Sequence, residues 1–131
     1  MIKKRLNFAK EYFSDAIELY KSQKYNSSSS RAYYSAYQAM WAALGDPQNG
    51  KRWKHGAIAR HFIRGYWFKS DHPKNEQGLL EDKHLALKDL YTYRINSDYK
   101  AINIDHNELK NLLEILEEII NFIDQKINME V

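Results

Sequence analysis

The sequence predicts an all-α fold: an up-and-down antiparallel bundle of four main helices plus one additional helix. Three observations support it. Only two prolines and five glycines interrupt the 131 residues. Few segments alternate apolar and polar residues as half-buried strands do, whereas several long ones repeat apolar residues every three or four positions. Short loops between such helices favour antiparallel neighbours, and the length predicts one domain over residues 1–131.

The first helix is predicted over Ile2–Ser22, where an apolar stripe faces inward and lysines and glutamates lie mostly outside. The segment after it, residues 24–30, reads KYNSSSS. Serine and asparagine compete for backbone hydrogen bonds and favour helix N-caps. This segment is therefore predicted to be a capping loop before the second helix. A phosphate-contacting or modified loop is the alternative.

The second helix, Ser30–Leu44, reads SRAYYSAYQAMWAAL and is predicted to be the central helix, ending before Gly45 as a natural C′ residue. Large apolar side chains form one face and alanines form a second stripe, where another helix can approach closely: Tyr33, Tyr37, Met40, Trp41 and Leu44, then Ala32, Ala36, Ala39 and Ala43. A helix that is apolar on most sides is buried on most sides. Its polar line, Arg31, Ser35 and Gln38, is therefore expected to be covered by a specific partner or to line a groove.

Three more helices follow. The third is predicted over Lys54–Phe68 and the fourth over Leu79–Asn96, with an exposed loop at Lys69–Gly78 between them. Asp105 or Asn107 is expected to cap the last helix, which runs to about residue 128. That helix has the clearest amphipathic pattern of the chain, with leucines and isoleucines on one face and acids on the other.

The charges are unevenly distributed, although the net charge is only +3. Residues 51–74 hold seven Lys or Arg against one acid, and residues 105–131 hold seven acids against two lysines. Such asymmetry steers a phosphate-rich partner or orients two associating copies. Aromatic residues interleave with the cations of a basic patch, which comprises Lys51, Arg52, Lys54, Arg60 and Arg64. This pattern suits base stacking and phosphate contacts; the alternative is that the aromatics are core and the cations solvated.

Several classes of protein are disfavoured. The chain has no cysteine, so nothing suggests disulfides or a thiolate metal site, and a cytoplasmic protein is expected. The basic amino terminus reaches no apolar run, which argues against a secretory signal. No apolar stretch approaches the ~18–20 residues that span a bilayer, so no membrane partner is expected. The histidines have no metal-ligand spacing, and neither a metal, a cofactor nor a catalytic residue is predicted.

The end of the fourth predicted helix holds the strongest candidate for a binding site. Residues 91–99 read YTYRINSDY, and Arg94 falls on the apolar line set by Leu87 and Tyr91. A guanidinium there must be paired or must open into a groove. One interpretation is a structural ion pair with Asp98. The other is an anion or RNA-phosphate groove, whose candidate residues are Arg31, Ser35, Gln38, Arg94, Asp98 and Tyr99.

Three segments together resemble the HEPN domain family. They are the SRAYY stretch of the second helix, the Lys54-His55-Gly56 entry to the third, and Arg94-Ile95-Asn96-Ser97-Asp98-Tyr99, which resembles an Arg-x-x-Ala-Asp-Tyr signature with Ser in place of Ala. The resemblance covers nearly the whole chain and implies a small helical bundle, expected to form a homodimer. Many members are metal-independent ribonucleases or toxins that carry an Arg followed four to six residues later by His.

That nuclease motif is absent here, because no histidine follows an arginine at that spacing. The resemblance therefore implies a member without a recognisable catalytic motif. Such members bind nucleotides or RNA, or accompany a small nucleotidyltransferase in a toxin–antitoxin-like pair. Two alternatives stay open. One is a ribonuclease toxin with a displaced catalytic group, and the other is a purely structural dimerisation domain.

Overall fold

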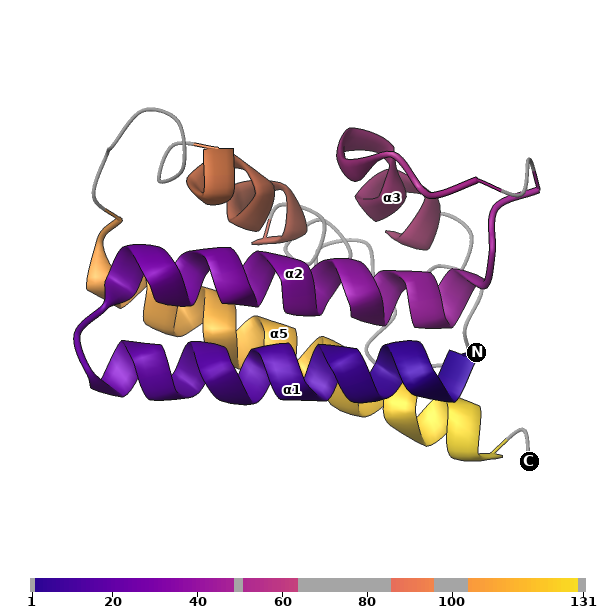
Figure 1. Cartoon of the computed structure of the whole chain (residues 1–131), viewed down its shortest axis with the longest axis horizontal. Helices are drawn as coiled ribbons and strands as arrows, with labels where there is room; N and C mark the ends of the chain where they lie inside the picture. Colours follow the sequence, from indigo (N-terminus) through magenta and orange to yellow (C-terminus); the bar gives the residue numbers. More distant parts are fainter. Residues whose placement is uncertain (1, 49–50, 64–85, 96–103, 130–131) are drawn as a thin grey trace.

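The structure is a computed structural model that describes residues 2–48, 51–63, 86–95 and 104–129. Its helices are α1 (Ile2–Lys21), α2 (Tyr25–Leu44), α3 (His55–Phe62) and α5 (His106–Met129), and residues 86–95 are helical as well. The described ranges contain no strand. α1 runs antiparallel to both α2 and α5 (Figure 1). α3 and the helix of residues 86–95 lie on the side of α2 away from α1. The all-α bundle predicted from the sequence is confirmed.

Small side chains bring α1 and α2 close together. The alanines at this interface are fully buried or nearly so: Ala9, Ala16, Ala32, Ala36 and Ala39. The Ser28 hydroxyl donates to the carbonyl oxygen of Ala16, and the Ser35 hydroxyl donates to that of Ala9, both at 2.7 Å. A serine reaches a backbone carbonyl of another helix only where the two backbones lie near each other. The predicted approach face of the alanine stripe is thus confirmed.

The capping loop predicted for residues 24–30 is wrong. α2 begins at Tyr25, so the serines form its first turns, and Ser28 and Ser29 are completely buried. Serine has a low helix propensity mainly because its hydroxyl competes for local backbone groups. Here the Ser28 hydroxyl is occupied by α1. The small side chains also extend the alanine stripe, so tertiary packing overrides the local preference.

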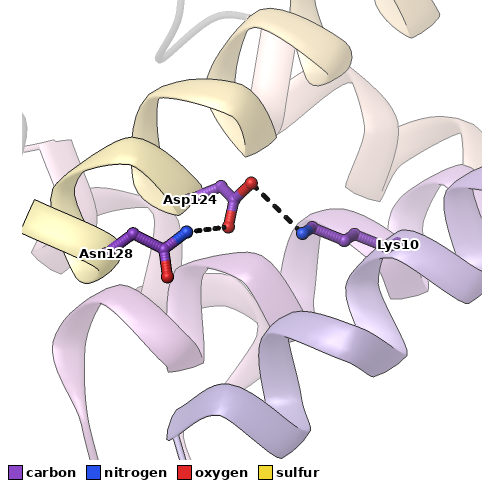
Figure 2. Close-up of polar contacts among 3 residues, drawn as sticks. All are labelled: Lys10, Asp124 and Asn128. Carbon is purple, nitrogen blue, oxygen red and sulfur yellow. Dashed lines mark hydrogen bonds and ion pairs between the residues drawn. The ribbon is translucent and has the colours of Figure 1, made fainter. Parts of the chain in front are cut away.

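α5 supplies the largest share of aliphatic residues to the core. Its buried side chains are Leu109, Leu112, Leu113, Leu116, Ile119, Ile120, Phe122 and Ile123. Asp105 caps this helix as predicted, because its Oδ1 accepts from the backbone N–H of Asn107 at 2.8 Å. Near the other end, Lys10 of α1 lies 3.1 Å from Asp124, which also accepts from Asn128 at 2.9 Å (Figure 2). The ion pair is partly exposed and contributes about 1 kcal/mol at most, so apolar burial dominates.

The remaining elements begin or end close to where the sequence predicts. Gly45 follows α2 with a φ of 78°, and its N–H donates to the carbonyl of Trp41, as expected of a C-terminal glycine. The predicted third and fourth helices are confirmed over 55–62 and 86–95. Their other predicted residues, and the loop expected between them, lie outside the described residues. None of the described helices is both long and apolar enough to cross a membrane.

Candidate functional site

A hollow of about 450 Å³ is lined by residues of α2, α3 and the helix of residues 86–95. Each of these elements contributes an aromatic or imidazole ring, from Tyr33, His55 and Tyr91 respectively. Arg60 and Lys88 are exposed and add two positive charges to its lining. None of the described lining residues is acidic. The hollow therefore combines stacking surfaces with cations, and nothing described in its lining repels an anion.

Tyr33 is the residue on which the site converges. Only 2% of it is exposed. Its ring centroid lies 5.6 Å from that of His55 and 5.5 Å from that of Tyr91, and the Arg94 guanidinium lies 5.3 Å from it. Its hydroxyl and Nδ1 of His55 share a hydrogen bond. One buried ring thus connects α2 with both α3 and the helix of residues 86–95.

The electrostatics of the site keep His55 neutral. Its ring stacks on that of Tyr37, with centroids 4.4 Å apart and planes at 24°. Burial lowers the pKa of His55, and the positive charges of Arg94 and Arg52 lower it further. Burial raises the pKa of the Tyr33 phenol. The phenol therefore stays protonated and the imidazole uncharged around neutral pH.

Arg94 contacts the rings of Tyr33 and Tyr34. Its guanidinium lies 5.3 Å from the ring centroids of both Tyr33 and Tyr34, and it donates to the Tyr34 hydroxyl at 3.2 Å. The half-buried cation is held by aromatic faces, which attract positive charge. Asp98, the expected ion-pair partner, lies outside the described residues, as does Tyr99. Arg94 thus contacts Tyr33 and Tyr34, and its pairing with Asp98 stays a prediction.

The other members of the predicted groove face α1. The Arg31 guanidinium lies 5.7 Å from the ring of Tyr12, and Gln38 accepts from Arg5 at 3.0 Å. Ser35 is fully buried against α1 through the hydrogen bond described above. α1 thus covers Ser35 and binds Gln38, in line with one of the two expectations for this polar line, whereas Arg31 stays exposed. The grouping of Ser35 and Gln38 with Arg94 in one groove needs correction, because α2 presents them to a different neighbour.

Arg31 and Arg94 are connected only indirectly. Arg31 lies over Tyr12, whose ring centroid is 6.0 Å from that of Tyr34, and Tyr34 contacts Arg94. Arg31 is exposed, whereas Arg94 is half-buried. Among the described residues, two tyrosine rings thus lie between Arg31 and Arg94, in a row across α1, α2 and the helix of residues 86–95.

The basic patch surrounds the start of α3. Lys51, Arg52, Lys54 and Arg60 are all exposed, and Arg64 lies outside the described residues. Phe62 is completely buried and belongs to the core, as the structural alternative held. Trp53 is half-buried and differs, because it lines a second hollow of about 700 Å³ together with Arg52 and Lys54. Within the described residues, the patch thus combines exposed cations with the half-buried ring of Trp53.

The sequence was also compared with models of known protein families. The sequence model of the HEPN domain matches residues 2–126. The chain belongs to the HEPN family. No curated protein matches it. Membership in the HEPN subset with the Arg94–Tyr99 signature stays a prediction, because the match is to the HEPN domain as a whole.

The sequence did not single out His55 as a site residue of this HEPN domain. The histidines were considered as metal ligands, and among the described residues no group of three His, Asp or Glu side chains is placed to hold a metal ion. A usable signal existed in the Lys54-His55-Gly56 entry to the third helix. This motif did not reveal that His55 contacts Tyr33, because the two residues are 22 positions apart and meet only through the packing of α3 on α2.

Proposed function

We propose that this HEPN protein is a nucleotide- or RNA-binding module and that the hollow between α2, α3 and the helix of residues 86–95 is its binding site. One observation carries the proposal: His55, Tyr91, Arg60 and Lys88 converge on a hollow with no acidic residue in its described lining. A volume of about 450 Å³ is within the ordinary range of small-molecule sites, roughly 300–1,000 Å³.

The lining suits the two parts of a nucleotide. The half-buried ring of Tyr91 and the imidazole of His55 offer faces on which a base stacks. The exposed Arg60 and Lys88 provide charge-assisted hydrogen bonds for a phosphate. Tyr33 and His55 hold each other through a ring contact and a hydrogen bond, and Arg94 lies against the Tyr33 ring, so this wall of the hollow is ordered before a ligand arrives.

Isothermal titration calorimetry with adenosine monophosphate tests this proposal. The Arg60→Ala/Lys88→Ala double variant is expected to bind at least tenfold more weakly than wild type, because a hydrogen bond to a charged group contributes about 1.5–3 kcal/mol. The matched control is Lys21→Ala/Lys110→Ala, which removes two exposed charges at the end of α1 and the start of α5. It is expected to bind within twofold of wild type. A folded wild type that binds no nucleotide contradicts the proposal, and so does an equal loss in the control.

Metal-independent RNA cleavage is the second candidate function. His55 and Arg94 contact the same Tyr33 ring, so a histidine from α3 takes a place near Arg94 that the sequence spacing does not provide. A neutral imidazole accepts a proton near neutral pH, as general-base catalysis requires. RNA recovered intact after incubation with the folded protein at pH 6–8 counts against this candidate.

Homodimerisation and pairing with a small nucleotidyltransferase in a toxin–antitoxin-like system belong to the same proposal. Membership in the HEPN family is what supports them. In the alternative of a purely structural dimerisation domain, Arg94 only stabilises the fold and no nucleotide binds. The calorimetry therefore distinguishes a binding module from a structural domain.

A further inference from the structure

We propose that the ligand of this HEPN protein is a single-stranded polynucleotide, and that the second hollow, beside Trp53, holds a neighbouring nucleotide of the same strand. The inference rests on the proposed function, because it takes the His55 hollow as the first nucleotide site. The second hollow has a volume of about 700 Å³, and its described lining includes Arg52, Trp53, Lys54 and His61.

α3 separates the two hollows. His55, Ala59 and Arg60 line the first, whereas Ala57 and His61 line the second. At 3.6 residues per turn these two sets occupy opposite sides of the helix. A helix with its side chains is about 10 Å across, so a single nucleotide does not fill both hollows. A strand that crosses α3 does.

The second hollow repeats the chemistry of the first. The ring centroids of Trp53 and His61 lie 5.3 Å apart with planes at 48°, and the indole N–H donates to the carbonyl of Gly45 at 2.8 Å, which fixes the Trp53 ring. The exposed cation Lys54 lies beside this ring in the lining. The one acid in the described lining is Asp46, which accepts from the indole N–H of Trp41 at 3.0 Å. A base and a phosphate are again accommodated together.

Positive charge joins the hollows across the start of α3. Arg52 lines the second hollow, and its charge also acts on His55 in the first. Gly56, at the start of α3, lines the first hollow, and an added Cβ there would meet no atom within 4 Å. The backbone there is exposed and carries no side chain that blocks a phosphodiester. Cations that follow a path between two aromatic sites are typical of single-stranded nucleic-acid binding.

The test compares a mononucleotide with a strand. Adenosine monophosphate and an oligoadenylate of six nucleotides are titrated into wild type and into Lys54→Ala/His61→Ala, a variant of the second hollow only. The oligonucleotide is expected to bind wild type at least tenfold more tightly than the mononucleotide. In the variant the oligonucleotide should lose about tenfold in affinity, while the mononucleotide stays within twofold of wild type. The slope of log K against log salt should become shallower by about 0.7 for each phosphate that the variant no longer neutralises.

The control is Lys21→Ala/His106→Ala, which removes the same residue types at the ends of α1 and α5 away from α3 (Figure 1). It should leave both affinities within twofold of wild type. Equal affinity of wild type for the two ligands overturns the second site and leaves the proposed function standing. An oligonucleotide affinity that the Lys54→Ala/His61→Ala variant does not change overturns it as well. Failure of wild type to bind either ligand overturns the proposed function itself.

Discussion

Arg94→Ala is expected to lower the free energy of unfolding by about 2 kcal/mol, or roughly 8 °C in melting temperature for a chain of this size. The substitution removes a guanidinium that lies 5.3 Å from two tyrosine rings and donates to Tyr34. A cation over a partly desolvated ring contributes about 0.5–2 kcal/mol, and the hydrogen bond adds about 1 kcal/mol or more. Breaking a fully buried ion pair would cost about 3–5 kcal/mol. A loss in that range would indicate that Arg94 also pairs with an acid outside the described residues.

Two variants make the Arg94 result specific. Arg94→Lys should recover less than half of the loss, because an ammonium lacks the planar guanidinium that lies against two rings. Arg31→Ala removes the same residue type from an exposed position with one ring contact at 5.7 Å, and should change stability by at most about 0.5 kcal/mol. Chemical denaturation followed by circular dichroism measures all three. A change below about 0.5 kcal/mol for Arg94→Ala would show that the tyrosine contacts contribute little to stability.

Acidification is expected to destabilise the protein through His55. Its pKa is lowered in the fold, chiefly by burial and then by Arg94 and Arg52. The folded state therefore binds a proton less readily than the unfolded chain, whose histidine titrates near pH 6.5. The stability that the neutral ring contributes is fully present above about pH 6.5 and is lost as the pH falls through 6.5 toward the folded-state pKa. The slope reaches at most about 1.4 kcal/mol per pH unit for one proton.

His55→Phe isolates this effect, because phenylalanine keeps a ring against Tyr37 and does not titrate. Melting temperatures of wild type and variant are compared from pH 7.5 down to pH 5. The difference between them should move in favour of the variant as the pH falls, whatever the other groups of the protein contribute. Parallel pH profiles would show that His55 remains equally protonated in the folded and unfolded states, contrary to the stacked, hydrogen-bonded geometry.

The periodicity of the sequence predicted most of the described fold. The apolar stripe of the last helix and the alanine stripe of the second both lie in the core, because a residue's place on a helix face follows directly from its spacing. Residues 24–30 were mispredicted for a physical reason. The local preference of serine for caps was outweighed by contacts with α1, such as that between Ser28 and Ala16, which no local pattern reveals.

The candidate site was predicted only in part. Because Arg94 falls on the apolar line of Leu87 and Tyr91, the sequence predicted that other side chains would contact its guanidinium. Tyr33 and Tyr34 of α2 do contact it. The side of α2 that carries Ser35 and Gln38 could not be assigned to a neighbour, because both α1 and the fourth helix were open choices. His55 was missed because its role comes from the docking of α3 against Tyr33.

The most direct test of a nucleotide site beside α3 is an NMR titration of the histidine side chains with adenosine monophosphate, assigned through His→Gln variants. The ring signals of His55 should shift in a saturable manner. Those of His106, which stacks on Tyr25 at the start of α5, should stay in place and serve as the internal control. A saturable shift at His55 alone is the result that we predict. Binding that leaves His55 unmoved, or that shifts His106 instead, would contradict the site.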